Sequence, residues 1–210
     1  MPQAASSSQP ATPSAPGGLL VFVSGPSGVG KSTICRQLAR DLPAEFAVSA
    51  TTRAGKPQDA LGKRYLFITE PEFKQRLENN EFLEYANVFG HWYGTLKQPV
   101  VESLAAGKMV LLEIDVQGGS QIHQMFPDAV GIFIMPPAEK DLIARLQSRG
   151  RDDAASIQRR VAEAAAEVKA ACESGAYRFM VVNQVLVEAI EDIKRFVAAV
   201  RQPLNQLRQL

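Results

Sequence analysis

The protein has 210 residues, of which 46% are hydrophobic and 21% are charged, and its formal net charge is +1. These values are typical of a soluble globular domain with a sizeable core, and the near-neutral charge gives no reason to expect nucleic acid as a partner. No apolar run approaches the roughly 20 residues of a membrane-spanning helix, and two cysteines far apart in the sequence favour a reducing compartment. We therefore predict a cytoplasmic protein with neither a membrane nor a nucleic-acid partner.

The first eighteen residues consist almost wholly of Ala, Ser, Pro, Gln and Gly. They lack hydrophobic periodicity, the apolar segment of a secretory signal, and the Lys or Arg residues of a transit peptide. Such a composition cannot bury enough apolar surface to fold. We predict a disordered tail at residues 1–18 and one domain at residues 19–210.

A glycine-rich loop lies between the first predicted strand, residues 19–24, and the first predicted helix, residues 33–40. Its sequence, GPSGVGKS, matches the phosphate-binding pattern GxxxxGK[ST]. Strand, loop and helix in this order point backbone N–H groups at a polyphosphate, and a chance glycine turn does not explain the lysine and the hydroxyl that accompany them. The predicted nucleotide site comprises Gly25, Pro26, Ser27, Gly28, Val29, Gly30, Lys31, Ser32 and Thr33.

A β-rich segment follows the first helix. Residues 46–52 and 64–68 predict short strands, with a turn region rich in glycine and proline between them. Thr69 and Glu72 form a capping box, which predicts a helix at residues 70–79 that buries Phe73. We expect residues 50–97 to form a small mixed β-rich insert.

Strands and helices alternate through the remainder of the chain. Apolar runs predict strands at residues 109–116, 129–135 and 179–182. Hydrophobic periodicity and turn residues predict helices at residues 99–106, 120–125, 139–147, 154–173 and 187–200. This alternation predicts an α/β fold with a doubly wound parallel sheet, whose first strand leads into the phosphate loop.

Four further motifs follow the phosphate loop: SATTR at residues 49–53, EFLEY at 81–85, GHWYGT at 90–95 and LEIDVQG at 112–118. Together they closely resemble the motifs of guanylate kinases, which are P-loop kinases, and the resemblance covers residues 19 to about 200. It implies a core at residues 19–49, 98–137 and 161–210, a GMP-binding insert at 50–97 and a helical lid at 138–160. It also implies that the catalytic cations are Lys31, Arg145, Arg149 and Arg160.

The resemblance implies a guanine pocket formed by Ser49, Glu84, Thr95 and Asp115. Guanine offers adjacent N1–H and N2–H₂ donors, which Glu84 can accept together while Asp115 accepts the other amino hydrogen. The Thr95 hydroxyl is expected to donate to guanine O6. Adenine presents an acceptor at N1, so a carboxylate there would face lone pairs. Both carboxylates lie in apolar runs, where an unpaired charge is costly, which argues against two solvated side chains.

The residues that match the family's donors to the GMP phosphate are Arg53, Tyr65 and Tyr93. Either tyrosine, taken alone, is explained equally well as a half-buried strand aromatic. Lys56 occupies the position of a second family arginine, and it keeps the charge but loses the planar guanidinium. The competing interpretation leaves Lys56 in solvent, with Gly55 and Pro57 redirecting the turn.

Mg²⁺ bound with ATP is the implied cofactor, and Ser32 matches a family ligand to it. Glu113, at the carboxyl end of a predicted strand, either orients a metal-bound water or caps a helix, and the sequence leaves both open. Arg145 and Arg149 have the alternative of an ordinary solvated helix end. The family's N-D-D reads Asn183-Gln184-Val185 in this chain, which removes two acidic side chains.

The resemblance implies an enzyme of purine nucleotide metabolism that transfers the γ-phosphoryl group of ATP to GMP, or to dGMP, and releases ADP. One alternative is a kinase of the same fold for another phosphate acceptor. The other is a non-catalytic guanylate-kinase-like module that binds peptides. The intact Lys31 and Ser32 favour catalysis, while the sequence leaves monomer and homo-oligomer equally open.

Overall fold

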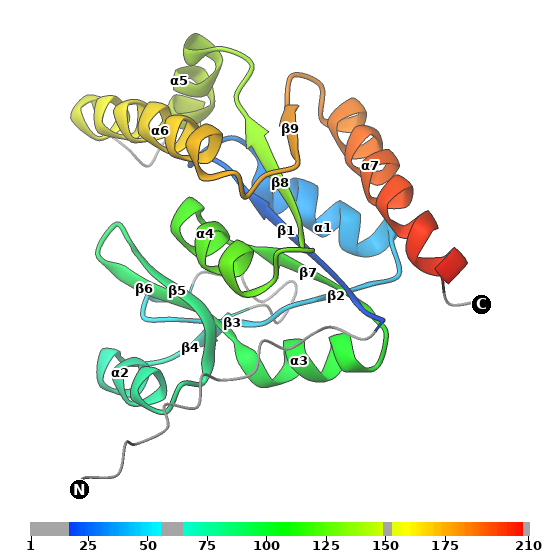
Figure 1. The fold of residues 1–210 in the computed structure, drawn as a ribbon. Coiled ribbons are helices and arrows are strands. Elements are labelled where there is room, and N and C mark those ends of the chain that lie inside the picture. The colour runs from blue at the N-terminus through cyan, green and yellow to red at the C-terminus, as the bar shows by residue number, and fades with distance from the viewer. Residues whose placement is uncertain (1–16, 56–64, 149–152, 208–210) are drawn as a thin grey trace, which may run out of the picture.

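The structure is a computed structural model that describes residues 17–55, 65–148 and 153–207, with side chains up to residue 201. Most of the predicted tail and the position of Lys56 therefore lie outside the described residues. Five parallel strands form the central sheet in the order β2-β7-β1-β8-β9 (Figure 1). They are β1 (Leu19–Ser24), β2 (Ala44–Phe46), β7 (Met109–Glu113), β8 (Val130–Met135) and β9 (Phe179–Val182).

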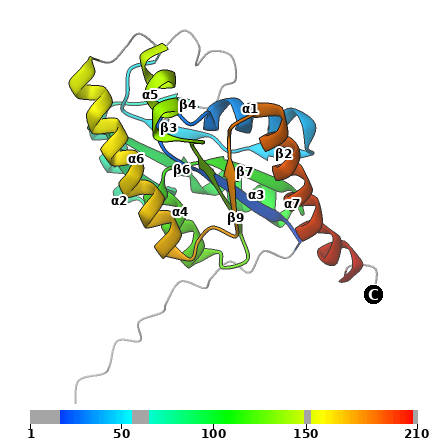
Figure 2. The ribbon, with the colours of Figure 1, turned by 90° about the horizontal axis from the view of Figure 1, so that it is seen from above.

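Helices cover both faces of this sheet because side chains of the central strand alternate between them. Val21 and Val23 of β1 pack in the cluster that includes α1 and α7, whereas Leu20 and Phe22 pack with α3 and α4 (Figure 2). The four helices are α1 (Lys31–Asp41), α3 (Lys97–Ala105), α4 (Val116–Met125) and α7 (Leu186–Leu207). The predicted doubly wound α/β fold is confirmed.

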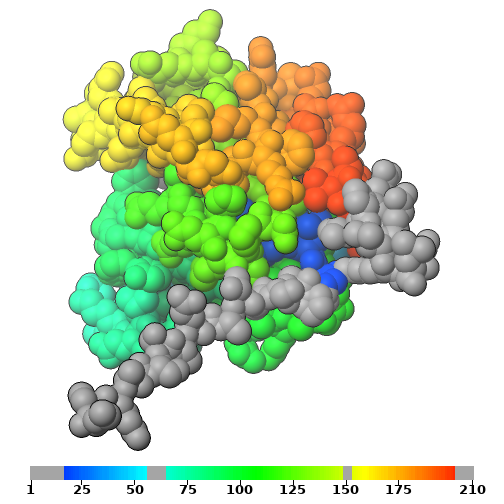
Figure 3. Space-filling view, viewed as in Figure 1, coloured from blue at the N-terminus to red at the C-terminus, as the bar shows by residue number. Residues whose placement is uncertain are grey.

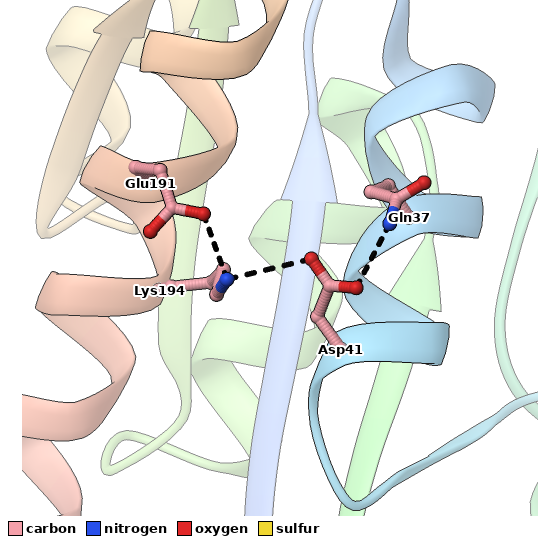
Figure 4. A network of polar contacts seen from close by, with 4 residues as sticks. All are labelled: Gln37, Asp41, Glu191 and Lys194. Atoms are coloured by element: carbon pink, nitrogen blue, oxygen red, sulfur yellow. Dashed lines mark hydrogen bonds and ion pairs between the residues drawn. The ribbon is translucent and has the colours of Figure 1, made fainter.

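A polar network joins α1 to α7 at the edge of their apolar contact. Lys194 Nζ lies 3.4 Å from Asp41 Oδ2 and 2.7 Å from Glu191 Oε1 (Figure 4). Gln37 Nε2 donates to Asp41 Oδ1 at 2.8 Å. The helix that follows the phosphate loop is thus tied to the last helix of the chain.

The insert forms a second, four-stranded sheet in the order β4-β3-β6-β5. Its elements are β3 (Ser49–Thr51), β4 (Tyr65–Phe67), α2 (Glu70–Glu78), β5 (Phe82–Val88) and β6 (His91–Leu96). Phe73 of α2 stacks on Phe82 and Trp92, with ring centroids 4.4 and 5.7 Å away, so Trp92 packs in the insert core. The predicted capping box between Thr69 and Glu72 begins α2.

A helical pair, α5 (Glu139–Ser148) and α6 (Ala154–Ser174), stands on the same side of the core as the insert (Figure 1). Leu142 and Leu146 of α5 pack against Ile157 and Ala164 of α6. Arg149 lies between the two helices in sequence and outside the described residues. Within the described ranges, no helix is both long and apolar enough to cross a membrane.

Two sequence expectations about element boundaries were wrong. Residues 46–52 are two strands in different sheets, because Ala47 N bonds Leu111 O of the core while Val48 O accepts from Leu96 N of the insert. The strand predicted at residues 109–116 ends at Glu113, and the helix predicted from residue 120 begins at Val116. The carboxylate of Asp115 caps that helix, which permits the early start despite two glycines in its first turns.

Candidate active site

The phosphate loop leaves the first turn of α1 open to a ligand. Gly30 is the N-cap residue of α1 with φ 101°, a conformation that favours glycine, and no side chain caps the helix. A Cβ at Gly30 would lie 2.7 Å from Asn183 Nδ2, so the loop packs tightly on the end of β9. Uncapped N–H groups at a helix N-terminus bind anions such as phosphates.

Lys31 lies inside the loop that precedes it. Its ammonium donates to the carbonyl oxygens of Gly25 and Pro26, the latter at 2.9 Å. Burial lowers the pKa of Lys31, while the nearby charges of Glu113 and Glu167 oppose that shift. A desolvated cation held by two carbonyl groups is a strong partner for an incoming phosphate.

Ser32 and Glu113 form an oxygen-rich pair beside the loop. The Ser32 hydroxyl donates to the Glu113 carboxylate, which stands at the carboxyl end of β7. Both side chains present hard oxygen ligands, and Mg²⁺ in proteins takes few such ligands, with water and phosphate oxygens completing its shell. The residues present therefore fit a Mg²⁺ ion that accompanies a nucleotide.

Glu84 is a buried carboxylate on the inner face of the insert, with 4% of its surface exposed. Thr95, its neighbour across β5 and β6, donates to Glu84 Oε1 from its backbone nitrogen at 3.0 Å and from its hydroxyl at 2.5 Å. Burial raises the pKa of Glu84 to about 7, the charge of Asp115 adds to the rise, and the Thr95 hydrogen bonds oppose it. The single hydroxyl proton of Thr95 is thus engaged with Glu84, where the sequence predicted a bond to guanine O6.

Asp115 brings a second carboxylate to the same place. As N-cap of α4, it accepts a hydrogen bond from Gly118 N at 2.8 Å. Burial raises the pKa of Asp115, while the Gly118 bond and the charge of Lys31 lower it. A Cβ at Gly118 would lie 3.0 Å from Glu84 Cδ and 3.3 Å from Asp115 Oδ1, so glycine allows the two carboxylates to approach.

Arg53 lies among aromatic rings at the outer end of the insert. Its guanidinium is 5.6 Å from the ring centroids of both Tyr65 and Phe67. Tyr65 and Tyr93 meet edge to face, with centroids 6.4 Å apart. The three predicted phosphate donors are therefore neighbours, and they present one guanidinium and two phenols.

Two arginines of the helical pair reach the phosphate loop. Arg145 Nη2 donates to Asn183 O at 2.8 Å and Nη1 to Val29 O at 3.4 Å. Arg160 Nη1 donates to Ser27 Oγ at 3.2 Å. Asn183 also holds the loop directly, because its Nδ2 donates to Val29 O at 2.8 Å. Because Arg145 bonds two backbone carbonyl groups, it is not an ordinary solvated side chain at a helix end.

A cavity of about 260 Å³ lies between the phosphate loop, the end of β7 and the insert. Nine predicted site residues line it: Gly25, Ser27, Lys31, Ser49, Tyr65, Glu84, Tyr93, Glu113 and Asp115. The phosphate-loop motif and the insert that carries the paired carboxylates thus face one common space.

Glu167 of α6 also lines the cavity, and the sequence interpretation missed it. Burial raises the pKa of Glu167 to about 7, with Lys31 lowering it and Asp115 raising it. The residue follows Arg160 by seven positions, which is two turns of the same helix face. The spacing of seven residues from Arg160, a predicted catalytic residue, is the sequence feature that could have predicted Glu167 as a site residue.

A parallel sheet with a phosphate-loop motif, facing a small insert that carries a guanidinium, two phenols and a buried carboxylate, defines a P-loop kinase of small phosphorylated acceptors. The sequence model of the guanylate kinase family matches residues 18–200. The chain belongs to the guanylate kinase family.

Individual relatives agree with this family. The guanylate kinase of Clostridium tetani is 38% identical over 191 residues, which are 91% of this chain and 90% of that protein. The guanylate kinase of Thermosynechococcus vestitus is 44% identical over 174 residues, 82% of this chain and 90% of its own length. The crystal structure of guanylate kinase from Anaplasma phagocytophilum superposes with a TM-score of 0.69 at 30% identity, covering 89% and 87% of the two chains.

Proposed function

We propose that the cavity carries out ATP-dependent phosphorylation of GMP, and of dGMP, to the diphosphate with release of ADP. The observation that supports it best is the pair of carboxylates, buried Glu84 and half-buried Asp115, in one cavity with the phosphate-loop lysine. A coupled assay of ADP release with GMP, dGMP, AMP, CMP and UMP tests the proposal. Comparable kcat/KM for GMP and AMP would contradict it.

Recognition of guanine rests on complementary donors and acceptors. The N1–H and N2–H₂ groups of guanine would replace water at Glu84 and Asp115, so that each carboxylate gains a donor. Thr95 fixes the orientation of Glu84 from the neighbouring strand. Adenine would leave these carboxylates facing a lone pair, and a site built for polar pairing rejects such a ligand by roughly 10⁴ or more.

Phosphoryl transfer requires alignment of the two nucleotides and neutralisation of their charge, and it requires no covalent chemistry by side chains. An oxygen of the GMP phosphate attacks the γ-phosphorus of ATP, and the bond to the β-γ bridging oxygen breaks. Arg53, Lys56, Tyr65 and Tyr93 would hold the attacking phosphate. Lys31, Arg145, Arg149 and Arg160 would neutralise charge at the transferred group, together with N–H groups of residues 25–33.

We assign Ser32 and Glu113 to a Mg²⁺ ion that arrives with ATP, Ser32 directly and Glu113 through water. The bound ion would supply positive charge to the β- and γ-phosphate oxygens. The hydrogen bond between the two side chains keeps both oxygen ligands together before nucleotide binds.

The insert at residues 50–97 and the lid at 138–160 would close over the core at 19–49, 98–137 and 161–210, and exclude water from the transferred group. A cytoplasmic location agrees with the cysteines, since buried Cys35 and exposed Cys172 both lie in the described residues and neither forms a disulfide. Calorimetry of ATP binding separates this enzyme from a non-catalytic module, which has no need of the phosphate loop.

A further inference from the structure

The turn between β5 and β6 contains a phenylalanine in a backbone conformation that phenylalanine seldom adopts. Phe89 and Gly90 connect Val88 to His91, and both have positive φ, 52° and 80°. A two-residue hairpin loop with φ positive at both positions favours Asn-Gly or Asp-Gly. Asn87 Oδ1 supports the turn by accepting from Gly90 N at 3.2 Å. The hairpin thus has a suitable glycine, with phenylalanine where a small polar residue is preferred.

Burial within the insert does not explain the phenylalanine. The side chain of Phe89 is 52% exposed, and it lies outside the apolar cluster formed by Phe73, Phe82 and Ala50. A bulky side chain in the left-handed region is strained. Departures of this kind from local rules are expected at functional positions.

The ring of Phe89 faces the guanidinium of Arg160. The distance from Arg160 Cζ to the ring centroid is 5.2 Å, within the range of a cation–π interaction. Arg160 also donates to Ser27 Oγ of the phosphate loop at 3.2 Å. In Figure 1 the tip of the β5–β6 hairpin points toward the first half of α6, and Figure 3 shows the insert beneath these helices. One arginine therefore joins the insert, α6 and the phosphate loop.

We propose that Phe89 is a positioning residue, which holds the Arg160 guanidinium over the phosphate loop for phosphoryl transfer. A ring face attracts a guanidinium through its plane and so leaves the N–H donors at its edge for phosphate oxygens. Phe89 and Ser27 both line the common cavity, so the arginine lies where the transferred group would pass. The inference rests on the proposed role of Arg160 in charge neutralisation.

Replacement of the ring by an aliphatic side chain isolates the aromatic contribution. Phe89→Leu should lower kcat by about twofold to thirtyfold, the range of a cation–π contact, and change KM for GMP by less than about twofold. Phe89→Tyr should restore the wild-type kcat. Tyr85→Leu, an exposed aromatic on the same hairpin, is the matched control and should behave as wild type. Equal loss in Phe89→Leu and Phe89→Tyr would overturn the inference.

A double-mutant cycle with Arg160→Gln separates this inference from the proposed function. If Phe89 acts through Arg160, then adding Phe89→Leu to Arg160→Gln lowers kcat no further, whereas independent effects multiply. Arg160→Gln with wild-type kcat would refute the proposed role of Arg160. A large loss in Arg160→Gln with wild-type behaviour in Phe89→Leu would refute only the positioning role.

Thermal stability gives a readout that a structural role would not reproduce. Phe89→Asn places the preferred residue in the turn and should raise Tm by about 2–4 °C, the shift for a gain near 1 kcal/mol in a chain of this size. The same variant should lower kcat as Phe89→Leu does. A fall in Tm that parallels the loss of activity would show that Phe89 only maintains the hairpin.

Discussion

The carboxylate of Glu84 lies against the backbone of Gly118, so that a Cβ at residue 118 would lie 3.0 Å from Glu84 Cδ. Glu84 belongs to the insert and Gly118 to the first turn of α4 in the core. The proposed guanine pocket is therefore formed where the insert meets α4 of the core. The shape of this pocket depends on the absence of a Cβ atom at Gly118 of α4.

We predict that Gly118→Ala raises KM for GMP by about tenfold or more, because displacement of Glu84 weakens a charge-assisted hydrogen bond to guanine. KM for ATP should stay within about twofold, since the phosphate loop is not touched. Steady-state kinetics with both substrates measure the effect. Ser120→Ala, two residues further along α4, is the control, and an unchanged KM for GMP in Gly118→Ala would contradict the assignment of this pocket.

Glu84 should make stability depend on pH. Its pKa is raised from 4.5 to about 7 by burial, so the folded chain binds the proton more tightly than the unfolded chain does. The stability contribution is fully present below pH 4.5 and is lost as pH rises through 7. Thermal unfolding of the nucleotide-free enzyme should therefore show a smaller Tm decrease with rising pH in Glu84→Gln than in wild type.

The same ionisation should control guanine binding. Guanine donors need the ionised carboxylate, so the inhibition constant of guanosine should fall by up to about tenfold per pH unit as pH rises toward 7. Guanosine lacks a phosphate, which removes a second titrating group from the ligand. Glu167→Gln should retain this pH dependence, because Glu167 is coupled to Lys31 and Asp115 rather than to Glu84. A flat profile in wild type would show that Glu84 does not contact the base.

Lys31→Met should lower kcat by about 10² or more without loss of stability. The ammonium is expected to stabilise charge that moves during transfer. Removal of one such stabilising group typically lowers kcat by about 10² or more. Burial lowers the pKa of Lys31, so the protein bears a desolvation penalty for this cation, which the substitution relieves. Single-turnover kinetics and thermal unfolding check the two halves of the prediction. Normal turnover would remove Lys31 from the phosphate site.

Lys56→Ala should raise KM for GMP, or lower kcat/KM, by about tenfold to a hundredfold, the loss of one charge-assisted contact. Lys56→Arg should be tolerated or mildly beneficial, because a guanidinium can grip two phosphate oxygens. Measurement of KM for GMP and of the inhibition constant of guanosine separates the two kinds of contact, because guanosine has the base but no phosphate. Wild-type values in Lys56→Ala would support the interpretation that this lysine lies in solvent.

Local rules predicted the elements whose causes are local. The capping box at Thr69 and Glu72 gave the start of α2, and the apolar run at residues 179–182 gave β9. Residues 46–52 were misread because the switch between sheets occurs from Ala47 to Val48, and each hydrogen bond there depends on a distant strand. The start of α4 was misread because two glycines have low helix propensity, and the cap at Asp115 overrides it.

In the candidate site, too, motifs predicted some features, whereas others depend on tertiary packing. Motif positions brought Glu84 and Asp115 to one cavity, with Thr95 bonded to Glu84 behind them, and the roles of all three toward GMP stay predictions. The engagement of the Thr95 hydroxyl with Glu84 follows from the register of β5 and β6, including the bulge near Glu84, and no single-strand pattern carries that information. Glu167 enters the cavity because α6 crosses above it, which is a property of tertiary packing.

If the insert closes over the core as proposed, the switch from Ala47 to Val48 should restrict that movement. The chain enters the insert at Val48 and leaves it near Leu96, and these two crossings are bonded to each other, Leu96 N to Val48 O at 3.1 Å. Two adjacent connections that are hydrogen-bonded to each other should allow rotation of the insert about one axis and resist sliding or twisting. A bound GMP would therefore travel on a single arc, and its phosphate would reach the ATP side in the same orientation at every turnover.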